Sequence, residues 1–155
     1  MDLPRLLMLI GIPGSGKSSW LKCQRLDGFE IVCPDQIRLE EYGNISSQAN
    51  NISVWYTAKI KVIDAINENR SVILDATNVN TKYRHEFIAG LPKCKLQAKI
   101  FRDEPQECYE RISRDLQAGR NRSDVPEETV YRMYGELLYT IKVIQSEGFE
   151  IILGV

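Results

Sequence analysis

Short apolar segments alternate along the chain with longer stretches in which apolar residues recur every three or four positions. The first kind is typical of buried strands and the second of amphipathic helices. The expected strands cover residues 5–10, 30–33, 71–75, 97–101 and 149–153. The expected helices cover residues 17–25, 36–42, 53–69, 81–89, 104–118 and 126–146, and residues 43–51 form a polar loop. This alternation predicts a parallel five-stranded sheet with helices on both faces.

Right-handed crossovers place the carboxyl ends of parallel strands at one edge of the sheet, where ligands bind in open α/β folds. The glycine-rich segment 11–18, Asp35, Asp75 and Arg102 each follow an expected strand. We therefore expect these four features to gather at one edge. Asp35 is also placed to cap the helix expected over 36–42.

Composition limits the class of protein. A chain of 155 residues with 43% hydrophobic and 26% charged residues suits one globular domain, 1–155. A net charge of −1 argues against a protein that coats nucleic acid along its length, though not against one that grips a strand end. The four cysteines form no C-x-x-C pair, so we expect free thiols and no zinc site. No signal-peptide or membrane-length segment stands out, and we expect a cytoplasmic protein.

Residues 11–18, Gly-Ile-Pro-Gly-Ser-Gly-Lys-Ser, fit the pattern G-x-x-x-x-G-K-[ST] between an expected strand and an expected helix. In such a P-loop, glycines bring backbone N–H groups and the helix N-terminus close to phosphate oxygens. Lys17 would reach the β- and γ-phosphates, and Ser18 would be a ligand of Mg²⁺. The alternative is a glycine-rich turn that fits by chance. The predicted ligands are ATP or another nucleoside triphosphate with Mg²⁺, held by Gly11, Gly14, Ser15, Gly16, Lys17, Ser18 and Ser19.

Asp75 ends an apolar strand. In P-loop enzymes a carboxylate in this place helps to hold the water shell of Mg²⁺ beside the P-loop serine, here Ser18. The alternative is an ordinary aspartate that stabilises the turn after the strand.

Asp35 and Arg38 lie three positions apart, on one face of a helix that begins near Asp35. The carboxylate suits a base that takes the proton of an attacking hydroxyl, and the guanidinium suits an acceptor phosphate. The alternative is a helix cap beside a solvent-facing arginine.

Arg120 and Arg122 lie in a polar loop between two helices. A loop of this kind closes over the triphosphate in P-loop kinases, and its arginine neutralises charge on the transferred phosphoryl group. The alternative is a solvated basic loop. The expected lid covers about residues 119–126.

Other polar and aromatic residues carry no predicted chemistry. We expect His85, the only histidine, to lie at the surface, and Arg111 and Arg114 to be surface or pairing residues. The aromatic residues expected to pack are Trp20, Trp55, Phe101, Tyr131, Tyr134 and Tyr139.

Four segments occur together in one order. They are the P-loop at 11–18, Pro-Asp-Gln-Ile-Arg at 34–38, Val-Ile-Leu-Asp-Ala-Thr-Asn at 72–78 with Arg84, and Arg-Asn-Arg at 120–122 followed by Val-Pro-Glu-Glu at 125–128 with Arg-Met-Tyr at 132–134. In this combination the chain resembles the P-loop kinases of the polynucleotide 5′-kinase group, which are related to the zeta-toxin-like P-loop kinases.

The resemblance implies a three-layer P-loop NTPase/nucleoside-kinase-like fold and a role for each matched residue. Lys17 and Ser18 would handle the triphosphate and Mg²⁺, and Asp35 would activate the 5′-hydroxyl. Arg38 would contact the phosphate next to the acceptor nucleoside. Arg120 or Arg122 would be the lid arginine. The acceptor and metal side of the pocket would be formed with the help of three residues after the third expected strand, Asp75, Thr77 and Asn78.

Three functions remain open from the sequence. The first is ATP-dependent phosphorylation of the 5′-hydroxyl end of DNA or RNA. The second is a kinase for a small alcohol, which the near-neutral charge also allows. The third is a non-catalytic module in which a nucleotide orders the loop of Arg120 for a partner.

Overall fold

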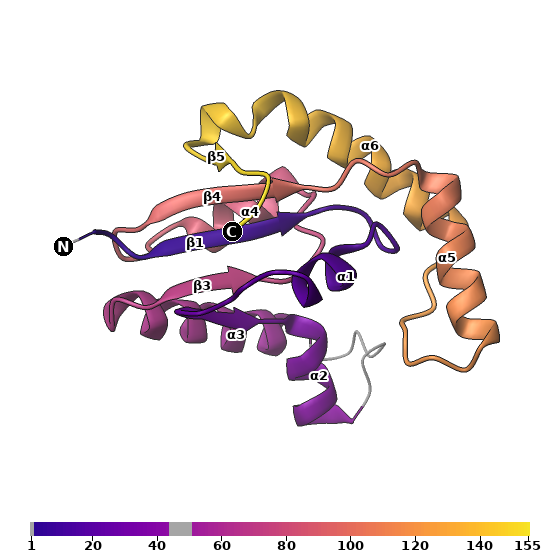
Figure 1. The fold of residues 1–155 in the computed structure, drawn as a ribbon, viewed down its shortest axis with the longest axis horizontal. Coiled ribbons are helices and arrows are strands. Elements are labelled where there is room, and N and C mark those ends of the chain that lie inside the picture. Colours follow the sequence, from indigo (N-terminus) through magenta and orange to yellow (C-terminus); the bar gives the residue numbers. More distant parts are fainter. Residues whose placement is uncertain (1, 44–50) are drawn as a thin grey trace.

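A computed structural model of the chain describes residues 2–43 and 51–155. Within these residues, five strands form one parallel sheet in the order β2-β3-β1-β4-β5 (Figure 1). The strands are β1 (Arg5–Ile10), β2 (Phe29–Val32), β3 (Ser71–Leu74), β4 (Lys95–Ile100) and β5 (Glu150–Ile151). The helices are α1 (Lys17–Lys22), α2 (Pro34–Tyr42), α3 (Asn51–Asn67), α4 (Thr81–Ile88), α5 (Pro105–Gln117), α6 (Glu127–Val143) and the short 3₁₀-helix η1 (Gln145–Glu147).

Strand β1 lies at the centre of the sheet and is buried on both faces. Its residues Leu6, Met8 and Ile10 belong to the larger hydrophobic core, and Leu7 and Leu9 belong to the smaller one. This alternation follows from the two-residue period of a strand, and it explains why β1 is apolar at successive positions. The P-loop therefore begins at the end of the best-buried strand.

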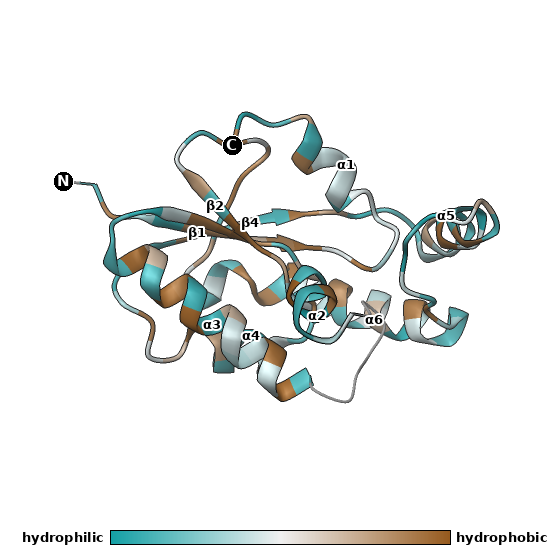
Figure 2. Cartoon of the chain, turned by 90° about the horizontal axis from the view of Figure 1, so that it is seen from below, coloured by the Kyte–Doolittle hydropathy of each residue, from teal (hydrophilic) through white to brown (hydrophobic). Residues whose placement is uncertain are grey.

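Helices cover both faces, as predicted, but unequally. α1 lies on one face, over the smaller core, and α3, α4 and α6 lie on the other (Figure 2). The chain thus has the three-layer α/β arrangement of the P-loop NTPase and nucleoside kinase folds. No helix in the described residues is long and apolar enough to cross a membrane.

The order of elements is confirmed, and several boundaries move. α2 begins at Pro34 instead of Gln36, because a proline ring presets the helical φ angle at the first position. Cys33 is its N-cap, so the expectation that Asp35 caps this helix is wrong. β5 keeps only two paired residues of the strand expected over 149–153. Of the loop expected over 43–51, residues 44–50 lie outside the described residues.

The prediction that six aromatic residues pack in the interior is correct for some of them and wrong for others. Phe101 is buried and makes an edge contact with Trp20, and Trp55 makes one with Phe87. Tyr131 and Tyr139 are exposed, so their expected packing is wrong. Both lie on the outer side of α6, where the helical pattern continues beyond the width of the buried stripe.

Candidate functional site

The P-loop connects β1 to α1 in a conformation that requires glycine at two places. Gly14 and Gly16 have φ angles of 81° and 91°, in the left-handed region that disfavours other residues. A Cβ atom on Gly14 would also collide with the backbone carbonyl of Cys108 on α5. The bend is closed by a hydrogen bond from the Ser15 N–H to the Ile12 carbonyl, 3.2 Å long. Helix α5 therefore packs directly against the P-loop.

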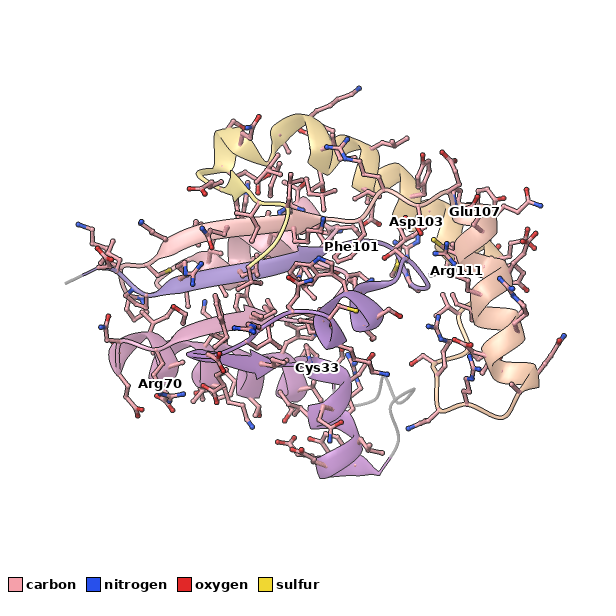
Figure 3. All side chains as sticks on the ribbon, viewed as in Figure 1. Cys33, Arg70, Phe101, Asp103, Glu107 and Arg111 are labelled. Carbon is pink, nitrogen blue, oxygen red and sulfur yellow. The ribbon has the colours of Figure 1, made fainter. Side chains whose placement is uncertain are left out.

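Arg111 on α5 is a second contact to the P-loop, and the sequence did not predict it. Its Nη1 donates to the Gly14 carbonyl at 3.0 Å and to Asp103 Oδ2 at 2.5 Å. Figure 3 shows Arg111 beside Asp103 and Glu107. The predicted pairing of Arg111 is confirmed through Asp103, whereas the contact to Gly14, 97 positions away, carries no local sequence signal.

Lys17 lies half-buried in the first turn of α1 and folds back over its own loop. Its Nζ donates to the carbonyls of Gly11 and Ile12 at 2.8 and 2.9 Å. Burial lowers the pKa of Lys17 to about 8, and the negative charge of Asp75 opposes that shift. The ammonium group is thus held by two backbone carbonyls and the Ser15 hydroxyl, within electrostatic range of Asp75, the carboxylate expected on the metal side.

Asp75 and Cys33 meet where β3 and β2 end. The Cys33 thiol donates a hydrogen bond to the Asp75 carboxylate, and burial raises the pKa of Asp75 above its usual value. Burial, then the charge of Asp75, raises the pKa of Cys33 to about 11, so this thiol stays protonated at neutral pH. Figure 3 labels Cys33 next to α2. The sequence assigned Cys33 no role, because its partner lies on another strand.

Asp35 and Arg38 form the predicted pair on one face of α2. Arg38 Nη1 donates to Asp35 Oδ1 at 2.6 Å, and Arg38 Nη2 donates to Asn51 Oδ1 at the start of α3. The side chain of Arg38 is only 8% exposed, whereas that of Asp35 is 58% exposed. The alternative of a solvent-facing arginine is therefore wrong. Within residues 2–43 and 51–155, the buried Nε of Arg38 has no hydrogen-bond partner, so among these residues the guanidinium keeps one donor unpaired.

A pocket of about 390 Å³ lies between β2, α2 and α3, and neither Asp35 nor Arg38 lines it. Gln36 and Glu40 of α2 and Lys61 of α3 line the pocket, and so do Cys33 and Asp75 at the ends of β2 and β3. The four cysteines are free, as expected.

The loop between α5 and α6 brings both arginines onto one carboxylate. Asp115 accepts a hydrogen bond from Arg120 Nη1 at 2.7 Å and forms an ion pair with Arg122, whose Nε lies 2.9 Å from Asp115 Oδ2. The Arg120 side chain is 72% exposed and that of Arg122 is 30% exposed. The positive charge of Arg122 also lowers the pKa of Lys17, so Arg122 lies within electrostatic range of the phosphate site.

Asn78 and Thr77 build the loop that follows β3. Asn78 has a φ angle of 53° and its side-chain amide donates to the Leu9 carbonyl at 2.8 Å. The Thr77 carbonyl accepts from the Gly11 N–H at 3.0 Å. Both residues thereby tie β3 to the P-loop, and their contact with an acceptor stays a prediction. Arg102 is exposed after β4, and His85 is exposed as expected.

The donor set fits magnesium better than a metal held by protein alone. The described residues contain no group of three or more His, Cys, Asp or Glu side chains placed to hold a metal ion. Magnesium in phosphate sites keeps several waters and takes one or two protein ligands plus phosphate oxygens. Ser18 is exposed at the start of α1, and Asp75 is close enough to Lys17 to oppose its pKa shift. Their oxygen atoms are of the kind that magnesium binds, and their role as its ligands stays a prediction.

A protein-family model, AAA_33, described as an AAA domain, matches residues 6–137. The chain belongs to this family. The AAA_33 domain is a P-loop kinase domain, and its fold implies that it binds a nucleotide. The resemblance to P-loop kinases is thus confirmed at the level of family and fold. Comparison with curated proteins finds no match.

Two solved structures show the same fold over most of the domain. A chain in the structure of the Pnkp1/Rnl/Hen1 RNA repair complex has a TM-score of 0.76 and 22% identity, and the match covers 92% of this chain and 46% of that chain. Deoxyadenosine kinase from M. mycoides with bound dATP has a TM-score of 0.56 and 16% identity, over 95% of this chain and 89% of that chain. The domain therefore spans less than half of the chain it matches in the RNA repair complex.

Proposed function

We propose that the AAA_33 domain transfers the γ-phosphoryl group of ATP to the 5′-hydroxyl end of a polynucleotide, DNA or RNA. The observation that carries this proposal is the Asp35–Arg38 pair, whose carboxylate is exposed and whose guanidinium is buried, with Asp35 within electrostatic range of Lys17. A module that only binds a nucleotide has no need of such a pair. The fold shared with the chain in the RNA repair complex supports the polynucleotide as acceptor.

In the proposed reaction the 5′-hydroxyl oxygen attacks the γ-phosphorus, and the bond from that phosphorus to the β,γ-bridging oxygen breaks. Asp35 takes the hydroxyl proton, because its carboxylate is exposed and only one of its oxygens is paired with Arg38. ADP is the leaving group. The products are ADP and a 5′-phosphorylated end.

The remaining groups bind and neutralise the phosphates. Lys17 exchanges its backbone carbonyl partners for phosphate oxygens, and the Nε of Arg38, unpaired among the described residues, meets the phosphate next to the acceptor nucleoside. Arg122 serves as the lid arginine. A magnesium ion held by Ser18 and, through water, by Asp75 would neutralise charge on the β- and γ-phosphates.

A small hydroxyl compound is the second candidate acceptor. The match to deoxyadenosine kinase extends over 89% of that chain, so a domain of this length and fold suffices for a nucleoside kinase. The pocket between β2, α2 and α3 is also large enough for a nucleoside. A cytoplasmic location belongs to both proposals, and the free cysteines support it.

The test uses ATP labelled at the γ-phosphate with matched 5′-hydroxyl and 5′-phosphate oligonucleotides of DNA and RNA, and with free nucleosides. We expect label on the 5′-hydroxyl oligonucleotides only. Asp35→Ala should lower the transfer rate by about 10²-fold or more, as for loss of a general base, with ATP binding retained. Asp64→Ala, which removes an exposed carboxylate of α3, is the matched control.

Label on nucleosides alone would replace the proposed acceptor with the small-molecule one. Absence of transfer to every acceptor, together with retained ATP binding, would favour the non-catalytic module. Full activity of Asp35→Ala would remove Asp35 from the mechanism.

A further inference from the structure

Arg84 on α4 is fully buried, and all of its hydrogen-bond donors are engaged. Its Nε and Nη2 donate to the two carboxylate oxygens of Glu147 at 3.0 and 2.8 Å. Its Nη1 donates to the Asn78 carbonyl and to Thr140 Oγ1, both at 2.9 Å. Its Nη2 also donates to Thr81 Oγ1 at 3.2 Å. An arginine has five N–H groups, and these five bonds use each of them once.

Stability alone does not account for this buried pair. The Arg84 side chain is 0% exposed and that of Glu147 is 7% exposed, so both charges have lost most of their hydration. The cost of that loss often cancels the attraction between the charges, and apolar side chains of equal volume stabilise a core as well or better. What distinguishes an arginine is the set of directed bonds by which it fixes its neighbours.

Those bonds hold the loop that carries Asp75. Arg84 binds the carbonyl of Asn78, and the hydroxyl of Thr140, itself bound to Arg84, donates to the carbonyl of Val79 at 2.8 Å. Asn78 has a φ of 53°, in the left-handed region that asparagine adopts more readily than most other non-glycine residues, and its carbonyl is fixed by Arg84. α4 and α6 thus restrain two successive peptide groups of the loop.

The same loop reaches the ends of two neighbouring strands. The Thr77 carbonyl accepts from Gly11, the first residue of the P-loop, and the Asp75 N–H donates to the Val32 carbonyl at 2.8 Å. The Asn78 amide donates to the Leu9 carbonyl of β1. A shift of this loop therefore moves Asp75 relative to the P-loop.

Helix α6 links this network to the arginine loop. It begins at Glu127, just after residues 119–126, and carries Thr140 near its other end, with Glu147 following in η1. Figure 1 shows α6 running from beside α5 toward β5, on the β4 and β5 side of the sheet. One helix therefore starts at the arginine loop and ends at the contacts that hold the Asp75 loop.

We propose that Arg84, together with Glu147 and Thr140, is a positioning residue for phosphoryl transfer. Its hydrogen bonds to Asn78 and Thr140 hold the loop of residues 75–79 against the P-loop and fasten both to the end of α6. This inference rests on the proposed function, because transfer is the step that needs Asp75 in register with Lys17.

The test compares two substitutions at one buried position. Thr140→Val keeps the shape of the side chain and removes the hydroxyl that bridges Arg84 and Val79, whereas Thr140→Ser keeps the hydroxyl. Arg84→Lys, which keeps the charge and loses the planar fork, is the second probe. Lys59→Met is the matched control, because Lys59 fastens the other end of α4 through the carbonyls of Glu86 and Ala89 and does not touch the loop.

Two readouts are measured on each folded variant. The first is amide hydrogen exchange of peptides that contain residues 75–79 and 11–18. The second is kcat and KM for ATP, measured with the acceptor that the labelling test identifies. For Thr140→Val we expect faster exchange in both peptides and a fall in kcat of about tenfold to 10²-fold, the range that a displacement of about 1 Å produces. KM for ATP should change little. Thr140→Ser and Lys59→Met should match the wild type in both readouts.

Unchanged exchange and unchanged kcat in Thr140→Val would overturn the positioning role, even if Arg84→Lys does not fold. An equal fall in kcat for Lys59→Met would also overturn it, since general loosening of α4 would then suffice. If the wild-type protein transfers phosphate to no acceptor, the proposed function fails, and the exchange comparison alone decides whether Arg84 holds the loop.

Discussion

At the scale of single residues, Lys17 shows how the site is prepared for a nucleotide. Its ammonium group lies on the carbonyls of Gly11 and Ile12, and burial lowers its pKa to about 8. The negative charge of Asp75 raises the pKa of Lys17, but not enough to offset the effect of burial. The protonated form that phosphate requires is therefore only moderately favoured at physiological pH.

We predict that ATP affinity falls as the pH rises above about 8. In that range the free protein has lost the Lys17 proton and must take one up to bind the triphosphate, so the dissociation constant should rise by up to about tenfold per pH unit. Calorimetry in two buffers with different ionisation enthalpies would measure the proton uptake. Lys17→Arg, which stays charged, should show no such uptake. A constant affinity from pH 7 to 10 would contradict the lowered pKa.

Arg122 and Arg120 share Asp115, yet only Arg122 is half-buried and acts on Lys17. We predict that Arg122→Ala lowers kcat by about 10²-fold or more, toward the range lost with an arginine that stabilises the transferred phosphoryl group. Arg120→Ala should have little effect and serves as the matched control. Steady-state kinetics with saturating ATP would measure both. The reverse order of effects would assign the lid role to Arg120.

At the scale of elements, the packing of α5 on the P-loop decides which residues the loop accepts. The backbone of Cys108 occupies the space of a side chain at Gly14, and Arg111 binds the Gly14 carbonyl. The P-loop is therefore held from outside as well as by its own sequence. Movement of α5 would change the nucleotide site directly.

We predict that Gly14→Ala weakens ATP binding and lowers the free energy of unfolding more than Gly28→Ala does. Both glycines have φ near +80°, so both substitutions strain the backbone, but a Cβ at Gly28 meets open space. The collision with Cys108 should add about 1–3 kcal/mol, as for overpacking. Urea denaturation and ATP titration of both variants would test this. Equal effects would show that backbone strain, and not α5, limits this position.

At the scale of the whole molecule, the site occupies one edge of a single sheet in a chain of net charge −1. The positive charges placed for phosphates are few, and Arg70, Arg120 and Arg132 are already paired with carboxylates. If the acceptor is the polynucleotide proposed above, such a surface suits contact with the end of the nucleic-acid strand more than with its length.

We predict a weak salt dependence of oligonucleotide binding. For single strands the slope of log K against log salt is about −0.7 per phosphate contacted, so one to three contacts should give a slope of about −1 to −2. KM for a 5′-hydroxyl oligonucleotide, measured over a range of salt concentrations, would test it, with a nucleoside acceptor as control. A slope of about −5 or steeper would indicate a longer basic track than the described residues suggest.

The sequence alone determined the order of strands and helices along the chain, the P-loop, and which residues follow each strand. These features depend on local spacing: the two-residue and 3.6-residue periods, the glycines of 11–18, and the place of Asp35 and Asp75 after apolar segments. Its errors were also local, as at Asp35, where Pro34 starts the helix one residue before the expected cap.

Only the tertiary structure decided which side chains meet. Asn51 holds Arg38, Cys33 donates to Asp75, Arg111 binds the P-loop, and Arg84 joins Thr140 to the Asp75 loop. In each case the partners lie on different elements, up to 97 positions apart, so no local pattern records the contact. The packing of α3, α4 and α6 against the sheet and of α5 against the P-loop brings them together, and this packing follows from the fit of the whole core.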